Sequence, residues 1–433
     1  MRRGFLPNRE VDSDPLYSPY PATRNKKPDR SDRLVSDTAL CSTDAPPYTV
    51  KELKFWGQKN IRLADDPSMA AKVDLDQLGS SQRLVFRHIK VGTVEVSALL
   101  DCAVLNMLPT CFSDPPPALE NAIEFRRTGV FANFDIRAAA LLHVEIPTIV
   151  MQNTLVLNFG MTSAEVYREL MRRASAKTLP ALLQLKNFQP PEMCEVEEGI
   201  LRSHARGIAL PAPDVPGSVA MGHSAVFLQA SRLNHCCSPN VMLRFDPQSF
   251  ALTVHSIRPI AKGEEIAHSY IDLTSAPTRD ARRSLLRDIC HFECLCDRCA
   301  LPDQAAVRES DARRQRIHDR SYAEILEPFE MWLRSNGRRD LQEVIAFHLA
   351  AVEEMQVEGL YHDPYSVHVR TLAACFAVQE DLRSFRAWMG KAREAALTRL
   401  AVKTAVDMLR YIVYPETFPW WGWVQRPQSS PRG

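Results

Sequence analysis

The chain has 433 residues, of which 45% are hydrophobic and 24% charged, a composition typical of two or three globular domains. Its 53 basic and 52 acidic residues leave a formal net charge of +1. No overall charge therefore indicates binding to nucleic acid or a membrane surface, and we expect neither. No apolar run follows the basic N-terminus, so we expect no secretory signal or membrane span and a nuclear or cytoplasmic location.

The cysteines are clustered rather than spread along the chain. Eleven are too few for a disulfide scaffold, and six lie between Cys236 and Cys299, which in a reducing compartment favours metal binding. The segment FECLCDRC places Cys294, Cys296 and Cys299 within six residues, so three thiols can reach one ion. Tetrahedral zinc needs a fourth ligand, which one of the adjacent Cys236 and Cys237 is placed to supply. The alternative is a set of unrelated buried thiols.

The first half of the chain begins without a regular pattern. Residues 1–48 are rich in Pro, Asp, Ser and Arg and are predicted to be a disordered tail, followed by a poorly defined extension at 49–119. The segment from Arg126 to Leu157 alternates short β-type runs, with a turn at Thr128-Gly129, and predicts a strand-rich core. Two or three helices are predicted at 162–206, where the first begins with Thr162 or Ser163 as N-cap and Glu165 in its first turn.

Strands return in the second half and then give way to helices. VMLRFD and FALTVHSI read as a hairpin turning through Asp246-Pro247-Gln248-Ser249. From about residue 305 the apolar residues follow helical spacing, which predicts an all-α region of stacked helical hairpins.

Three motifs occur in order between Asn234 and Cys299. They are Asn-His-x-Cys-x-Pro-Asn, then Gly-Glu-Glu-x-x-x-x-Tyr ending at Tyr270, then Phe-x-Cys-x-Cys-x-x-Cys. Taken singly, His235 reads as a core histidine and Tyr270 as a strand aromatic. In this order the motifs resemble the SET domain family of S-adenosylmethionine-dependent lysine methyltransferases. The branch most similar is the split-SET, SET-and-MYND-like group with its fungal relatives. TGVFANFDI, upstream, resembles the opening strand and turn of that family.

The resemblance implies an α+β fold. It consists of short SET-domain sheets with a helical insert, a zinc-bound post-SET flap, and an all-α, TPR-like C-terminal domain. The implied boundaries are a SET domain at 120–275 with its insert at about 155–225, a post-SET zinc segment at 276–302, a helical domain at 303–415, and a tail at 416–433.

The resemblance also implies roles for single residues. Asn234 and His235 match the pair that holds S-adenosylmethionine, and Gly129 matches the glycine of the cofactor loop. Phe292 matches the aromatic residue that stacks on adenine, and Tyr270 matches the catalytic tyrosine at the cofactor. Pro239-Asn240 would form a knot-like crossing, and Phe227 is a candidate wall of the lysine channel. The structural zinc ligands would be Cys237, Cys294, Cys296 and Cys299, which leaves Cys236 as a small buried hydrophobic residue.

Several positions depart from the family pattern. Arg127 replaces the first glycine of the cofactor loop, Ala139 stands where many members have glycine, and Cys290 replaces a tyrosine that lines the active site. Cys236 replaces the usual serine of the Asn-His motif. The cysteines outside this region, Cys41, Cys102, Cys111 and Cys194 among them, are too scattered for a MYND zinc finger.

Two classes of function follow. The first, which we favour because Asn234, His235 and Tyr270 are all present, is a monomeric protein lysine N-methyltransferase that acts on a histone or another protein. The second is a non-catalytic SET-like adaptor that keeps the fold and the zinc. A methyltransferase with a non-protein acceptor is a further alternative.

Overall fold

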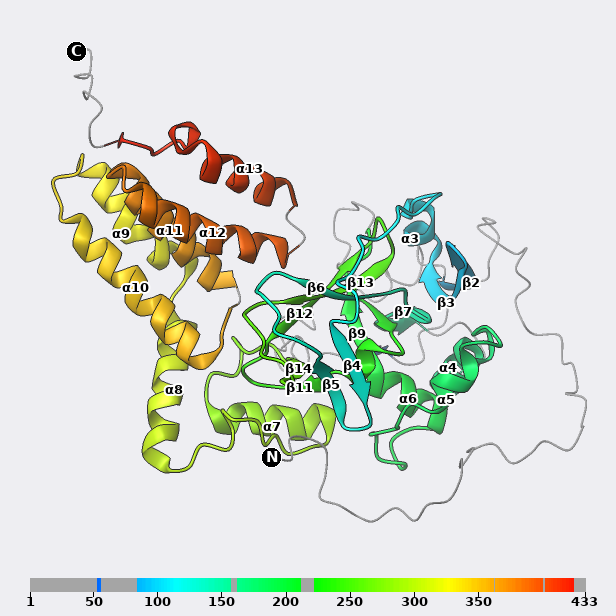
Figure 1. Ribbon diagram of the computed structural model, residues 1–433. Coiled ribbons are helices and arrows are strands. Elements are labelled where there is room, and N and C mark those ends of the chain that lie inside the picture. Colours follow the sequence, from blue (N-terminus) through cyan, green and yellow to red (C-terminus); the bar gives the residue numbers. More distant parts are fainter. Residues whose placement is uncertain are drawn as a thin grey trace, which may run out of the picture.

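The computed structural model describes residues 53–55, 84–156, 162–211, 222–361, 363–399 and 402–423. The predicted disordered tail at 1–48 and the end of the C-terminal tail lie outside the described residues. Figure 1 shows small sheets at the centre, helices α4 to α6 on one side, and a stack of helices α8 to α13 on the other. No helix in the described part of the chain is both long and apolar enough to span a membrane.

The largest sheet has five strands in the order β2-β3-β7-β10-β9. The outer strands β2 and β3 pair antiparallel through a two-residue turn at Gly92-Thr93, and β3 runs parallel to β7. They come from the region predicted to be a poorly defined extension, yet they belong to the central sheet. The five strands are β2 (Leu84–Val91), β3 (Val94–Asp101), β7 (Ile149–Gln152), β10 (His223–Val226) and β9 (Ala205–Ile208).

A four-stranded sheet, in the order β11-β14-β5-β4, carries most of the motif residues. Strands β4 and β5 pair through a turn at Arg127-Thr128, one residue earlier than the predicted turn, so Gly129 opens β5. Strand β11 runs parallel to β14, which places the Asn-His motif beside the strand that leads to Tyr270. The strands are β4 (Ile123–Arg126), β5 (Gly129–Ala132), β11 (Asn234–His235) and β14 (Glu265–His268).

Two further sheets complete the β-structure. The predicted hairpin is confirmed as β12 and β13, which pair antiparallel, and β6 joins the other side of β13. Apolar residues of β12, β13 and β6 form one core together with apolar residues of the four-stranded and five-stranded sheets. The strands are β12 (Val241–Asp246), β13 (Ala251–Ser256), β6 (Leu141–Glu145) and the small pair β1 (Leu53–Phe55) and β8 (Thr154–Val156).

The predicted helices at 162–206 are confirmed as three. Thr162 is the N-cap of the first, and its side chain and that of Glu165 form a reciprocal capping box. Leu170 and Ile200 belong to a second core in which the insert helices cover one face of the five-stranded sheet. The helices are α4 (Ser163–Arg172), α5 (Leu179–Leu183) and α6 (Val196–His204), and a short helix, α3 (Cys102–Met107), follows β3.

The chain is helical from α8 onward, as predicted from about residue 305, and it also contains a helix, α7, that was not predicted. Helix α7 precedes the cysteine-rich loop, and α8 to α13 pack around a separate core that includes Leu372 and Phe385. The aromatic segment at Phe418–Trp423 packs against this core. The helices are α7 (Arg279–Cys290), α8 (Gln304–Asp319), α9 (Tyr322–Arg334), α10 (Leu341–Glu358), α11 (Asp363–Val378), α12 (Leu382–Leu397) and α13 (Val402–Val413).

Candidate active site and zinc site

A cavity of about 1780 Å³ lies where the four-stranded sheet, the insert helices and the end of α10 meet. Three of the predicted site residues, Gly129, Asn234 and Tyr270, line it. They come from β5, β11 and the segment after β14, so the parallel pairing of β11 with β14 brings the two later motifs together. The cavity is larger than a typical small-molecule pocket and has room for two reactants.

Asn234 and Gly129 form one end of this cavity. The Asn234 Nδ2 donates to the carbonyl oxygen of Thr128 at 2.8 Å and to Oε1 of Glu265 at 2.6 Å. Gly129 has a φ of +152°, and a Cβ placed there would lie 2.7 Å from Glu265 Oε1 and 2.9 Å from Asn234 Nδ2. Only glycine leaves this end of the cavity open, because any side chain would push the asparagine and the carboxylate apart.

Two hydrogen bonds hold Tyr270 in the wall of the cavity. Its hydroxyl donates to the carbonyl oxygen of Leu233 at 2.7 Å, and its backbone N–H donates to Nδ1 of His235 at 3.0 Å. Burial raises the pKa of Tyr270, although the nearby Arg206 opposes the shift. The phenol therefore stays protonated at neutral pH, and because its O–H donates to Leu233, its oxygen offers an acceptor to a group in the cavity.

His235 links the tyrosine to the cysteine cluster. Burial lowers the pKa of His235 to about 4, so its ring is neutral at pH 7. Since Nδ1 accepts the Tyr270 N–H, the ring proton resides on Nε2, which lies 3.2 Å from Sγ of Cys237 and donates to it. A single imidazole thus connects the cavity wall with a predicted metal ligand, as an outer partner of a metal site often does.

Phe292 packs behind the cavity wall. Its ring meets those of His235 and Tyr270 edge to face, with centroids 6.0 and 6.2 Å apart, and it is 6% exposed. Neither Phe292 nor His235 is among the residues that line the cavity. Their contacts with the adenine of the methyl donor stay predictions.

Asn240 joins the Asn-His segment to β14. Its Nδ2 donates to Oε1 of Glu264 at 3.0 Å and to the carbonyl oxygen of Glu265 at 2.7 Å, and its Oδ1 accepts from the N–H of Ala267 at 2.9 Å. Asn240 is 2% exposed, so these bonds replace the hydrogen bonds to water that its amide loses on burial. The three bonds fix the crossing that holds Asn234 and His235 in position.

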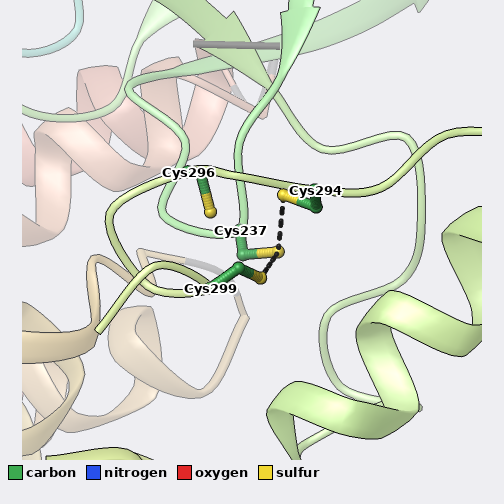
Figure 2. A group of neighbouring side chains, drawn as sticks. All are labelled: Cys237, Cys294, Cys296 and Cys299. Carbon is green, nitrogen blue, oxygen red and sulfur yellow. Dashed lines mark hydrogen bonds between the residues drawn. The ribbon is translucent and has the colours of Figure 1, made fainter. Parts of the chain in front are cut away.

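Four cysteines converge behind this segment (Figure 2), one from the loop after β11 and three from the loop after α7. The sulfur atoms of Cys237, Cys294, Cys296 and Cys299 all lie within 4.8 Å of one another, and all four side chains are buried. Cys237 Sγ lies 3.6 Å from that of Cys299 and 4.0 Å from that of Cys294. Zinc–sulfur bonds of about 2.3 Å in a tetrahedron separate the sulfurs by about 3.8 Å, so the cluster fits zinc.

The charge around the cluster also fits a metal. Four thiols this close and this deeply buried cannot all ionise unless a cation joins them. Two buried arginines lie beside the cluster. Burial opposes the charge of Arg282, but negative charge on Cys237 and Cys299 raises the pKa of Arg282 overall. Arg314 donates a hydrogen bond to the backbone carbonyl oxygen of Cys237. Their positive charges offset the net negative charge of a four-thiolate zinc centre.

The positions that depart from the family pattern have visible environments. Arg127 is exposed and lines the cavity from the β4–β5 turn. Ala139 has a φ of +60°, the left-handed conformation that explains why a glycine suits this position. Cys290 lines the cavity as a neutral thiol, because burial raises its pKa to about 11. The Cys236 thiol contacts the backbone of Ser238.

One expectation is wrong and three residues were missed. Phe227 is not a wall of the cavity: it is fully buried in the sheet core, and its neighbour Leu228 lines the cavity instead. Glu265 holds Asn234, and it stands within the Gly-Glu-Glu motif, so the motif itself was the signal. Arg206 and His268 line the cavity next to Tyr270. His268 stands at a variable position of the same motif, whereas the sequence around Arg206 carries no signal that could have found it.

Comparison with known proteins agrees with the geometry. Residues 127–271 match the SET domain family. Over this segment the chain is similar to SET domains, and it is similar to proteins named as set5 and SMYD lysine methyltransferases. The "Histone-lysine N-methyltransferase set5" of Schizosaccharomyces pombe is 38% identical over 102 residues, which are 23% of this chain and 31% of that protein.

Two further relatives show the same limited coverage. The human "N-lysine methyltransferase SMYD2" is 38% identical over 81 residues, 19% of this chain and 18% of its own. The mouse "Protein-lysine N-trimethyltransferase SMYD5" is 36% identical over 77 residues, 18% of each chain. The matched part thus spans less than a third of the length of these relatives. A solved structure, "ctPRC2 in an autoinhibited conformation bound to S-adenosylmethionine", covers 66% of this chain and 31% of its own at 12% identity; its TM-score of 0.17 is too low to support a conclusion.

Proposed function

We propose that this protein transfers a methyl group from S-adenosylmethionine to a lysine side chain of another protein. The observation that carries the proposal is the position of Tyr270, which lines the same cavity as Asn234 and Gly129 and is held there by its bonds to Leu233 and His235. The three relatives described above are named as lysine methyltransferases, which supports the same acceptor class.

The residues around Gly129 fit the methyl donor. The absence of a side chain at Gly129 keeps open a space bordered by the Glu265 carboxylate and the Asn234 amide. A carboxylate and a carbonyl oxygen suit the ammonium of the donor's amino-acid end, while Arg127 at the cavity edge offers a positive charge to its carboxylate. We assign Gly129, Asn234 and Glu265 to this end of the donor.

The chemistry needs alignment rather than a protein nucleophile. The bound donor supplies a methyl group on a sulfonium: the amine lone pair forms the nitrogen–carbon bond, and the sulfur keeps the electrons of the broken carbon–sulfur bond. The lysine must therefore arrive neutral, and the methylated ammonium formed by transfer then releases one proton to water. Tyr270, protonated and fixed, would orient the amine, and the walls of the cavity would exclude water.

The zinc would have a structural role. A closed set of four thiolates leaves no open coordination position for a substrate. Instead, the metal would join the loop after α7 to the segment that carries Asn234 and His235. The bond from His235 to Cys237 extends this support to Tyr270.

Calorimetric titration of the zinc-loaded protein with S-adenosylmethionine, beside the Asn234→Ala variant, tests the proposal. We expect micromolar binding that the variant loses, and transfer of tritiated methyl groups to members of an array of lysine-centred peptides. A folded, zinc-loaded protein that binds no donor would instead favour the adaptor function.

A further inference from the structure

An arginine lies at the catalytic end of the cavity. Arg206, on β9 at the edge of the five-stranded sheet, is half-buried and lines the same cavity as Tyr270. The Cζ of its guanidinium lies 5.8 Å from the centre of the Tyr270 ring. The position beside Tyr270 where an acceptor amine would be oriented therefore lies next to a fixed positive charge.

The guanidinium is held in place without a matching carboxylate. Its Nη1 donates to Nδ1 of His268 at 3.3 Å, its Nη2 donates to the carbonyl oxygen of Ala230 at 3.2 Å, and its buried Nε has no hydrogen-bond partner among the described residues. None of the ion pairs between described residues includes Arg206. A buried donor without a partner, on a side chain that lines a cavity, is uncommon in native proteins and asks for an explanation beyond holding the strand.

The charged and titratable groups near Arg206 come from α6, β6, α7 and the end of β14. His204, on α6, is neutral because burial lowers its pKa to about 4. Burial lowers the pKa of His268 far below its ordinary value, so it adds no charge, and the phenol of Tyr270 and the thiol of Cys290 are neutral. Glu145 is the nearby negative group, and its carboxylate already accepts the backbone N–H groups of Gln229 and Ala230. Arginine keeps its charge in such surroundings, so this end of the cavity is positive.

We propose that Arg206 is a specificity-determining residue of the acceptor channel: its guanidinium disfavours a bound lysine ammonium and selects the neutral amine that accepts the methyl group. This inference rests on the proposed function. The positive charge of Arg206 would disfavour protonation of the acceptor amine, in addition to the effect of the donor's own positive sulfonium.

The expected size follows from Coulomb's law. Two unit charges about 6 Å apart, at an effective dielectric constant of about 20, repel each other enough to change an affinity about a hundredfold. The same repulsion moves the titration midpoint of the amine down by about two pH units. Because Glu145 and solvent reduce the field of a half-buried arginine, we expect an effect of about tenfold, or about one pH unit.

The amine reacts only when neutral, so the rate rises with pH through the pKa of the bound amine. Arg206 lowers that pKa and shifts the rise to lower pH. Removing the charge in Arg206→Gln should move the rise about one pH unit upward, whereas Arg206→Lys keeps the charge and should leave it in place.

The first experiment measures binding without turnover. The best substrate from the lysine-centred peptide array is compared with the same peptide carrying norleucine, which is neutral and lacks the terminal amine, at the acceptor position. At pH 7 the wild-type protein should bind the norleucine peptide more tightly. This preference should fall about tenfold in Arg206→Gln and persist in Arg206→Lys, with melting temperatures checking that each variant folds.

The second experiment measures kcat against pH with the lysine peptide. A rise in kcat that is displaced to higher pH in Arg206→Gln, but not in Arg206→Lys, supports the proposal. Equal norleucine preferences in the wild type and Arg206→Gln, or parallel pH profiles, overturn it while leaving methyl transfer intact. A gain of activity in Arg206→Gln at every pH would show that Arg206 blocks the channel, which also overturns it. A wild-type protein that methylates no peptide overturns both this inference and the function on which it rests.

Discussion

Arg314 on α8 donates a hydrogen bond of 2.8 Å from Nη2 to the backbone carbonyl oxygen of Cys237. The same guanidinium bonds through Nε to Oε2 of Glu358, the last residue of α10, at 2.8 Å. Arg314 is 2% exposed and Glu358 is fully buried. The helical domain is therefore joined to the cysteine cluster through a buried ion pair, and Gly359 allows the approach because a Cβ there would lie 1.7 Å from Oγ of Ser238.

We predict that Arg314→Met lowers the free energy of unfolding by about 3 kcal/mol, because it leaves the buried Glu358 carboxylate without its closest cation. Zinc should also leave faster when a chelator is added, since the Cys237 backbone loses its anchor. Arg316→Ala is the matched control: Arg316 lies on the same helix, is half exposed and pairs with Glu354, so its loss should cost less than about 1 kcal/mol. Equal losses of stability in the two variants would contradict the prediction.

Acid should act on the same ion pair. Burial alone would raise the pKa of Glu358, but Arg314, Ser310 and Arg313 lower it overall. A glutamate whose pKa is lowered by folding contributes stability that is present above its ordinary pKa of about 4.3 and is lost as the pH falls through the folded value. As the pH is lowered from 6 to 3, the free energy of unfolding should thus fall more steeply in the wild type than in a Glu358→Gln variant. Parallel curves would mean that Glu358 is not the group responsible.

The cysteine cluster predicts a metal content that can be counted. One zinc ion per chain is expected, and Cys294→Ser should remove it, because three remaining thiolates bind a structural zinc far more weakly and the loop after α7 has no other support of that strength. Elemental analysis of purified protein gives the number directly. Cys290→Ser is the control, since Cys290 lies four residues away but outside the four-cysteine group, and it should retain the metal.

Tyr270→Phe should separate catalysis from folding. The change removes one hydroxyl, whose bond to the Leu233 carbonyl contributes about 1 kcal/mol to stability, so the protein should fold and bind the methyl donor. The rate of transfer should fall about 100-fold or more, because the acceptor amine loses the group that orients it. Tyr365→Phe, in the core of the helical domain, serves as the control and should keep full activity. Normal transfer by Tyr270→Phe would remove the tyrosine from the catalytic role.

Much of the site could be predicted from the sequence because its chemistry is carried by consecutive motifs. Asn234, Tyr270 and the four cysteines stand in short segments whose order alone identified them. The first helix of the insert was also predictable, since the two residues of its capping box, Thr162 and Glu165, lie three positions apart in the sequence. These features are local, and local patterns survive in a single sequence.

The features that were missed depend on contacts between distant segments. The hairpin at 84–101 alternates only weakly, and its assignment to the central sheet follows from its pairing with β7, more than 50 residues away. Arg206 meets Tyr270 across 64 residues, and Phe227, just after β10, packs in the sheet core while Leu228 lines the cavity. No spacing rule within one segment contains this information.

Gly129 gives the most direct test of the donor end of the cavity. Gly129→Ala would place a Cβ 2.7 Å from Glu265 Oε1 and 2.9 Å from Asn234 Nδ2, closer than such contacts normally allow, at a φ of +152° that alanine avoids. The two polar side chains must then move, so we expect the affinity for S-adenosylmethionine to fall at least about tenfold. Gly390→Ala, within α12 where a Cβ meets open space, should stabilise the protein slightly and leave the affinity unchanged. An unchanged affinity in Gly129→Ala would show that the donor does not contact this end of the cavity.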